Sequence, residues 1–272
     1  MKKSDIALMK ARCSVRSYSK RAMNHAVEGQ LLDFIHYVEN PFNAKIRVEY
    51  IKNEKHIGNQ RLGTYGIIKN PQAFLVAICD RGDFSEEALG YTFEKVVLYC
   101  TQLGLGTCWI GGTFNKGAFA DRAELKNKEM LPIISPVGMA SSTPSLMSKT
   151  MSLMTKQRSR RAFETLFFKE HWNVPLSQKT AGVYGIPLEM VRLAPSSRND
   201  QPWKVLLDGK NVHFYRTLPR SMNRIDLGIA LCHFDLSCKE LGLKGHFEKV
   251  DEAFDDIPQD GFYTISWVSE ES

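Results

Sequence analysis

The sequence lacks the cysteine and histidine patterns that hold a metal ion or a disulfide framework. Its six cysteines include no C-x-x-C pair, and its seven histidines include no H-E-x-x-H motif. Zinc sites and small disulfide-bonded domains depend on such close spacings. We therefore expect no metal site. We also expect that the cysteines are free thiols in a reducing compartment: Cys13, Cys79, Cys100, Cys108, Cys232 and Cys238.

A long apolar run is also missing. The first five residues carry two lysines, and Arg12 and Arg16 follow before any apolar core could form. This pattern does not match a signal peptide, and no later stretch is apolar enough to span a bilayer. These absences predict a cytoplasmic protein with no membrane partner.

The charge is not gathered in blocks of one sign. There are 36 Lys and Arg against 30 Asp and Glu, a net charge of +6, and the two signs interleave along the chain. Without a basic stripe interleaved with aromatic residues, nucleic acid is not an expected partner. The charge is typical of a solvated surface, or it attracts an anionic ligand such as a dinucleotide.

Two common nucleotide-binding motifs are absent as well. The Walker pattern G-x-x-x-x-G-K-[ST] does not occur, and the string that begins Gly104-Leu105-Gly106 has Trp109 where a Rossmann fingerprint needs its third glycine. The string continues to Gly111-Gly112, where backbone N–H groups could approach the edge of a flat ligand closely. An ordinary glycine turn has the same composition.

What the sequence does contain is a weak internal repeat. A shift of 138 positions aligns Leu89–Gly106 with Leu227–Lys244, with seven identical residues. Both segments have the apolar spacing of a helix, and both end in L-G-L. Gly104 and Gly242 are therefore predicted to cap the ends of two equivalent helices.

Other elements recur in the same order, so that each half reads helix, loop, strand, helix, strand. This mixture predicts the α+β class, with two tandem lobes at residues 1–150 and 151–272, joined by the polar segment Ser141–Gln157. Two unrelated domains of similar composition are the alternative. The matched pairs are Leu31–Val38 with Leu188–Ala194, Phe74–Cys79 with Val212–Tyr215, and Ile134–Val137 with Ile265–Val268.

Near the N-terminus, Arg12 and Arg16 stand two residues to either side of Ser14. Two guanidinium groups so spaced can converge on one anion, and the planar fork of arginine suits phosphate oxygens. The same R-x-S-x-R pattern also occurs at solvated helix ends. Cys13 lies between the arginines, whose positive charge would favour a reactive thiolate, but packing inside the motif is the simpler explanation.

A second polar segment, Leu193–Trp203, reads L-A-P-S-S-R-N-D-Q-P-W. A helix is predicted to stop at Pro195, and two hydroxyls and an amide follow within a few residues. Such a loop offers the short hydrogen-bonding groups that a polar heterocycle requires. Ser, Asn and Pro also dominate simple turns.

Together, the three strings resemble the nitroreductase family of FMN enzymes, and most closely the branch with two nitroreductase-like lobes in one chain. The matching strings are R-x-S-x-R, A-P-S-S-x-N-x-Q-P-W and L-G-L-G-T-x-W-I-G-G. The resemblance covers essentially the whole chain, and the last two strings are specific. It implies a nitroreductase-like fold and FMN as the cofactor.

The resemblance also implies roles for individual residues. Arg12, Ser14 and Arg16 would hold the phosphate, ribityl chain and pyrimidine end of FMN, and Gly111 and Gly112 would present backbone N–H groups to its N5 and O4 edge. A basic residue late in the first lobe, Arg160 or Arg158, would complete the phosphate site. From the opposite lobe, the flavin would be contacted by Pro195, Ser196, Ser197 and Asn199.

Each half of the chain keeps the strings that the other half lacks. The first half has Pro41–Lys45 where the S-S-x-N loop would stand, and the second has Leu243–Phe247 where W-I-G-G would stand. It also has no clear R-x-S-x-R at Arg158–Ala162. We therefore expect one flavin site per chain, in a monomer that acts as a pseudo-dimer.

The expected activity is electron transfer from NAD(P)H, through FMN, to a nitroaromatic, a quinone or a similar oxidant, by a ping-pong mechanism. No side-chain nucleophile is needed, because the cofactor carries the chemistry. A flavin-binding sensor or storage protein without turnover is the main alternative. Flavin fragmentation and reductive dehalogenation, which relatives of this fold perform, are others.

Overall fold

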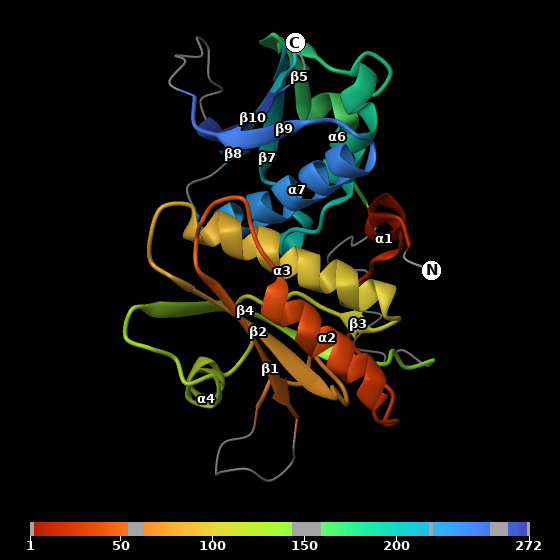
Figure 1. Ribbon diagram of the computed structural model, residues 1–272, viewed down its shortest axis with the longest axis vertical. Helices are drawn as coiled ribbons and strands as arrows, with labels where there is room; N and C mark the ends of the chain where they lie inside the picture. Colours follow the sequence, from red (N-terminus) through yellow and green to blue (C-terminus); the bar gives the residue numbers. More distant parts are fainter. Residues whose placement is uncertain (1–2, 54–61, 143–158, 218–219, 251–260, 271–272) are drawn as a thin grey trace. The chain divides into compact units, whose positions relative to one another are not determined.

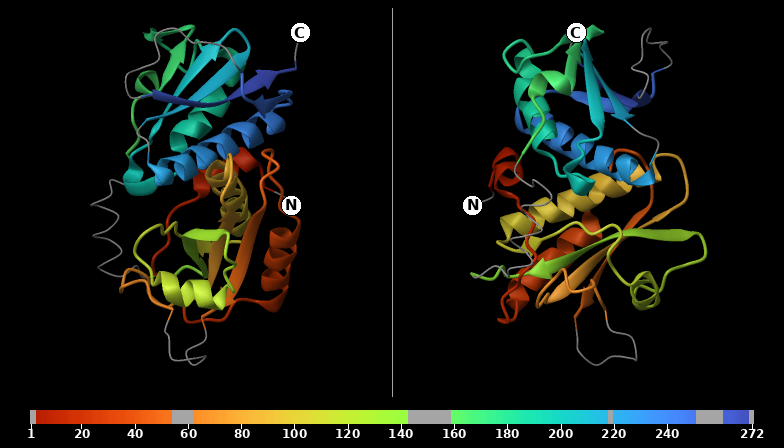
Figure 2. Two further views of the ribbon diagram at one scale, coloured as in Figure 1. Left: turned by 90° about the vertical axis from the view of Figure 1, so that its left-hand side faces the viewer. Right: turned by 180° about the vertical axis from the view of Figure 1, so that it is seen from behind.

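The computed structural model describes residues 3–53, 62–142, 159–217, 220–250 and 261–270. The chain forms two compact units, which Figures 1 and 2 show from three sides. The first comprises Met1–Lys3 and Ala11–Gln157, and the second comprises Ser4–Lys10 and Arg158–Ser272. Most of the polar segment predicted to join the lobes lies outside the described residues, as does Arg158.

The first unit is built on a four-stranded antiparallel sheet with the order β1-β2-β4-β3. Its central strand β2 is buried along seven of its eight residues, in keeping with its unbroken apolar sequence AFLVAIC. The strands are β1 (Ile46–Lys52), β2 (Ala73–Asp80), β3 (Gly106–Thr107) and β4 (Glu129–Gly138).

Helices cover both faces of this sheet. The helices α2 (His25–Tyr37) and α3 (Ser85–Gln102) pack against each other and against β1, and α3 also packs against β2. On the other face, Phe119 of α4 (Lys116–Arg122) packs edge-on against Phe74 of β2, with ring centroids 5.0 Å apart. Figure 2 shows the sheet between α2 and α4. Successive residues of β2 therefore face different helices, which explains why the whole strand is apolar.

The second unit contains a six-stranded sheet with the order β6-β5-β7-β8-β10-β9, in which β5 and β7 are parallel and the other pairs antiparallel. Three short 3-10 helices lie between the strands and helices of this unit: η1 (Phe163–Thr165), η2 (Gly182–Tyr184) and η3 (Ser197–Asn199). The strands are β5 (Phe167–Lys169), β6 (His171–Pro175), β7 (Trp203–Asp208), β8 (Asn211–Thr217), β9 (Gly245–Glu248) and β10 (Gly261–Ser269).

Two helices, α6 (Gly185–Leu193) and α7 (Ser221–Glu240), pack against each other in this unit. Phe234 of α7 meets Phe214 of β8 and Trp267 of β10 edge-on, with ring centroids 5.2 and 5.6 Å apart. All three aromatic side chains are buried, so this layer forms the core of the unit.

The N-terminal helix α1 (Asp5–Ala11) belongs mostly to the second unit, although the chain continues into the first. The carboxylate of Glu240, the last residue of α7, accepts hydrogen bonds from the hydroxyl of Ser4 and from the backbone N–H of Ile6. These are N–H and O–H donors at the start of α1, which need an acceptor outside the helix. The residue after α1 is Arg12, the first of the R-x-S-x-R motif.

The two predicted helix caps are confirmed. Gly104 and Gly242 both have φ +76°, and the residues after them donate backbone hydrogen bonds of 2.8 and 2.9 Å to Cys100 and Cys238. This 6→1 bond with a left-handed glycine is the Schellman motif. The long helices α3 and α7 thus end in the same way.

Each half of the chain contains more helices and strands than the sequence predicts. The structure adds β1, β3 and α4 to the first unit, and α1, β5, β6 and β9 to the second. In the part of the chain that the structure describes, no helix is long and apolar enough to cross a membrane.

Candidate functional site

The R-x-S-x-R segment runs as an extended strip between two other parts of the first unit. Ser14 forms a parallel bridge with Thr107, and the N–H of Val15 donates to the carbonyl of Thr107 at 2.8 Å. On the other side, the N–H of Lys69 donates to the carbonyl of Arg16 at 2.9 Å. The fold therefore places this motif directly beside the start of the T-C-W-I-G-G string.

Arg12 has a buried side chain, only 6% exposed. Its Nε lies 3.8 Å from Oε1 of Glu94, in the middle of α3, which is too long for a hydrogen bond. Both Nε and Nη1 are buried and find no hydrogen-bond acceptor within the described residues. A buried guanidinium N–H without an acceptor lowers the stability of the fold. The guanidinium of Arg12 is therefore suited to bind an anion or a carbonyl oxygen.

Glu94 also contacts the L-G-L-G-T-x-W-I-G-G string. Its Oε2 accepts the indole N–H of Trp109 at 3.0 Å, and the ring of Trp109 meets that of Phe93 edge-on. Glu94 is completely buried. Glu94 was not among the site residues predicted from the sequence, because an acid in a helix is usually solvated.

The glycines of the L-G-L-G-T-x-W-I-G-G string differ in what surrounds them. A Cβ added at Gly106 would lie 2.7 to 2.9 Å from three side-chain carbons of Val15, so close packing requires this glycine. A Cβ added at Gly112 would meet no atom within 4 Å. Packing within the described protein thus does not explain the absence of a side chain at Gly112, whereas a ligand beside the backbone would.

The cysteines near these strings correct one expectation. Cys13 is exposed, so it does not pack inside the motif as predicted. Cys108 is the buried thiol of this region, and burial raises its pKa, while the positive charge of Arg16 and a hydrogen bond with Ser14 act in the opposite direction. A buried thiol with a raised pKa is a poor nucleophile.

In the second unit, the polar loop after α6 is held by its own hydrogen bonds. The hydroxyl of Ser196 accepts from the N–H of Gln201 at 2.9 Å, and the amide nitrogen of Asn199 donates to the carbonyl of Ser159 at 2.9 Å. The N–H of Ser197 donates to Oδ1 of Asp226, on α7, at 2.9 Å. Burial raises the pKa of Asp226 to about 7, since the opposing hydrogen bond from Ser197 offsets only part of the desolvation.

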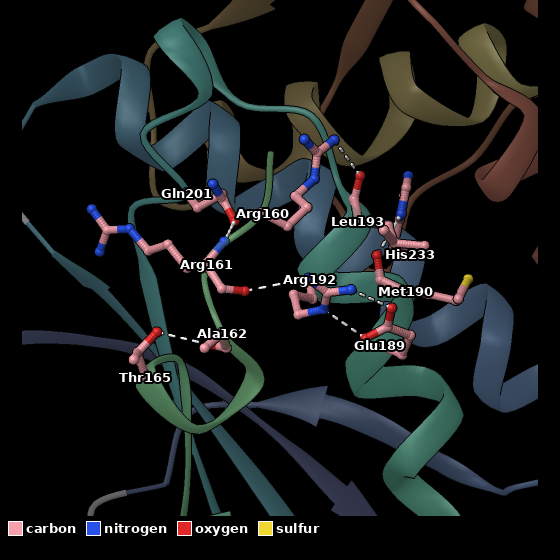
Figure 3. Close-up of polar contacts among 10 residues, drawn as sticks. All are labelled: Arg160, Arg161, Ala162, Thr165, Glu189, Met190, Arg192, Leu193, Gln201 and His233. Atoms are coloured by element: carbon pink, nitrogen blue, oxygen red, sulfur yellow. Dashed lines mark hydrogen bonds and ion pairs between the residues drawn. The ribbon is translucent and has the colours of Figure 1, made fainter. Parts of the chain in front are cut away.

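Figure 3 shows where Arg160 and its neighbour Arg161 lie. Arg160 donates from Nη1 to Oδ1 of Asn199 at 3.1 Å. It also donates from Nη2 to the carbonyl of Leu193 at 3.0 Å, a bond that Figure 3 shows. The guanidinium of Arg161 points away from this group, while its backbone N–H donates to Oε1 of Gln201 at 2.9 Å. The structure thus brings Arg160, and not the side chain of Arg161, to the S-S-x-N loop.

The predicted site residues therefore form two groups, each inside one unit. The group of the first unit is Arg12, Ser14, Arg16, Gly111 and Gly112, and that of the second is Arg160, Pro195, Ser196, Ser197 and Asn199. Across the described ranges, no three His, Cys, Asp or Glu side chains gather as a metal site would need.

Comparison with known proteins identifies one family. The model of the family described as "Putative TM nitroreductase" matches residues 5–238. A Thermotoga maritima protein described as a putative nitroreductase has a similar structure, with a TM-score of 0.64 at 20% identity, covering 100% of this chain and 96% of that one. This likeness confirms the predicted α+β nitroreductase fold. No curated protein matches the chain.

Other solved structures are similar over part of the chain. One described as an oxidoreductase containing FMN has a TM-score of 0.49 at 14% identity, covering 64% of this chain and 94% of its own. A Clostridium difficile R20291 protein described as an FMN-dependent nitroreductase has a TM-score of 0.40 at 17% identity, covering 52% and 90%.

Proposed function

Because this chain belongs to the "Putative TM nitroreductase" family, we propose that it is an FMN-dependent oxidoreductase. The electron donor is NAD(P)H, and the acceptor is a nitroaromatic, a quinone or a similar oxidant. The observation that carries the proposal is the buried guanidinium of Arg12, whose Nε and Nη1 have no acceptor among the described residues. It belongs to a strip that pairs with Thr107, five residues before Gly112.

The residues present fit the phosphate of FMN. Phosphate oxygens accept charge-assisted hydrogen bonds, and an arginine fork is well suited to donate them. Arg12 is partly neutralised by Glu94, so Arg16, which is buried, adds the second positive charge. The half-buried Ser14 between them adds a hydroxyl donor. This fit supports an anionic ligand at the strip.

We assign the other residues by the same reasoning. The backbone N–H groups of Gly111 and Gly112 would meet the edge of the flavin ring, where, with Arg16, they would stabilise negative charge. Arg160, which is held at the polar loop, is the basic residue that we assign to the phosphate. From that loop, the flavin would be contacted by Pro195, Ser196, Ser197 and Asn199.

We propose one FMN per chain, held by both groups of residues, in a monomer that acts as a pseudo-dimer. The reason is that each half of the sequence carries only the strings that the other half lacks. When bound, FMN supplies two-electron transfer between NAD(P)H and the acceptor. The protein supplies binding, orientation and electrostatics.

The test of cofactor binding is the visible spectrum of the purified protein, with the released flavin quantified against the chain. We expect a yellow protein with about one FMN per chain. Two flavins per chain would contradict the single-site proposal. A colourless protein that rejects added FMN would contradict the function itself.

The test of turnover is steady-state kinetics with NAD(P)H and a quinone or a nitroaromatic. If only one face of the flavin is open, donor and acceptor must use it in turn, and double-reciprocal plots give parallel lines. Intersecting lines would show that both substrates bind together. A flavin that NAD(P)H does not bleach would instead favour a sensor or storage protein.

A further inference from the structure

The polar loop of the second unit has an unusual backbone. Arg198, Asn199 and Gln201 all have positive φ, at 54°, 62° and 48°. Such left-handed conformations are uncommon for residues other than glycine, and each costs free energy that surrounding contacts must offset. Three of them within four residues indicate that the loop is held in this shape by specific contacts.

Most of those contacts come from the loop itself or from the chain beside it. Gln201 binds the backbone of Asn199 and of Arg161, and the hydroxyl of Ser196 accepts from the N–H of Gln201. A side chain from a long helix also reaches the loop. Asp226 of α7 accepts the N–H of Ser197, at the start of the left-handed stretch.

Asp226 is an unusual residue to find in that place. It is only 3% exposed, and its Oδ2 is buried without a hydrogen-bond partner among the residues described. Asp200, on the same loop, is the charged group that acts on it, and it has the same sign. A buried acid with one unsatisfied oxygen and a like-charged neighbour costs stability. The hydrogen bond from the N–H of Ser197 offsets part of that cost.

We propose that Asp226 is a positioning residue of the flavin site. It fixes Ser197 and thereby keeps the Ser196–Gln201 loop in the left-handed conformation that contacts FMN. The role in FMN binding rests on the proposed function, whereas the role in holding the loop does not.

The matched control is Asp235, on the same helix. It is also buried, at 4% exposure, but its Oδ2 binds Nζ of Lys239 one turn further along α7. Asp235→Ala therefore removes a buried acid from α7 without touching the loop. Asp226→Asn keeps an oxygen that can accept from Ser197, and Asp226→Ala does not.

The first measurement is amide hydrogen exchange of residues 195–203 in the protein without FMN. We expect protection of the Ser197 amide in the wild type, faster exchange of the loop in Asp226→Ala, and wild-type exchange in Asp226→Asn and Asp235→Ala. Equal exchange in wild type and Asp226→Ala would overturn the proposal. If Asp226→Ala fails to fold, the wild type still decides, because an unprotected Ser197 amide overturns it as well.

The second measurement is FMN affinity, from quenching of flavin fluorescence. Asp226→Ala should bind FMN about tenfold more weakly, the factor expected for one lost hydrogen bond to a charged group. Asp226→Asn should restore most of the affinity, and Asp235→Ala should leave it unchanged. A loop released in Asp226→Ala with unchanged FMN affinity would overturn the positioning role. A wild type that binds no FMN would refute the proposed function and leave the exchange result standing.

Discussion

The indole N–H of Trp109 donates to the buried carboxylate of Glu94 at 3.0 Å. The other oxygen of that carboxylate is the one that lies 3.8 Å from Nε of Arg12. One acid in the middle of α3 thus contacts two strings that are about a hundred residues apart in the sequence. The arrangement orients the arginine and anchors the segment that leads to Gly111-Gly112.

Removing this acid should destabilise the protein. Glu94→Ala leaves the Trp109 N–H without its buried acceptor and the Arg12 guanidinium without its buried counter-charge. Breaking a buried ion pair costs about 3 kcal/mol or more. Glu94→Gln should cost less, because its amide oxygen can still accept from Trp109. Urea unfolding of the FMN-free protein measures both. Equal stability of wild type and Glu94→Ala would show that the contact contributes nothing.

Replacing Arg12 or Arg16 by Ala should release FMN. Charge-assisted hydrogen bonds to phosphate are worth roughly 1.5–3 kcal/mol each, which is about tenfold to a hundredfold in affinity. Titration with FMN measures the loss, and circular dichroism checks that the fold persists. Arg12→Lys is the matched control, because it keeps the charge and loses the planar fork.

Arg12→Ala also removes the positive charge beside the buried Glu94, so the double variant Arg12→Ala with Glu94→Gln separates binding from folding. It should be more stable than Arg12→Ala and equally poor at holding FMN. Full FMN affinity in either arginine variant would remove the strip from the proposed phosphate site.

The stability of the protein should depend on pH through Asp226. Its pKa is about 7 in the folded chain, against about 3.9 in an unfolded one, so the folded state binds the proton more tightly. Its contribution to the free energy of unfolding is therefore fully present below pH 4 and is lost as pH rises toward and through 7. Across that window the loss is on the order of 4 kcal/mol.

Asp226→Asn removes the titration and isolates it from all the other groups. The stability of the wild type relative to Asp226→Asn should fall steadily when urea unfolding is repeated at pH 4.5, 6 and 8. A constant difference between wild type and Asp226→Asn would show that Asp226 does not titrate in this range.

Local signals in the sequence predicted the parts of the fold that depend on local chemistry. The L-G-L ends of α3 and α7 were predictable because a left-handed cap favours glycine wherever the helix lies. The added strands β1 and β6 were missed for an equally local reason. Neither is a continuous apolar run, since β1 is mostly half-buried and β6 mostly exposed.

The candidate site was predictable only as separate strings. No spacing in the sequence indicates that Ser14 lies beside Thr107, because that contact depends on how the sheet is assembled. Glu94 and Asp226 were missed because acids in a helix are usually solvated, and only the tertiary structure shows that these two are buried.

The glycines of the T-C-W-I-G-G string offer a final test that separates packing from ligand contact. Gly106→Ala would place a methyl group 2.7 Å from Cβ of Val15, inside the strip that carries Arg12 and Arg16. Overpacking of this kind costs roughly 1–3 kcal/mol. Gly112→Ala would place its methyl group in open space, with no atom within 4 Å.

We therefore expect opposite outcomes for stability and binding. Gly106→Ala should lower the unfolding midpoint measured without FMN, whereas Gly112→Ala should leave it unchanged. If the backbone of Gly112 lies against the flavin edge, its new methyl group must intrude on the ligand, and FMN affinity should fall in Gly112→Ala although the fold is intact. Unchanged FMN affinity in Gly112→Ala would mean that the flavin does not lie against the backbone of Gly112, since a methyl group there would intrude on it.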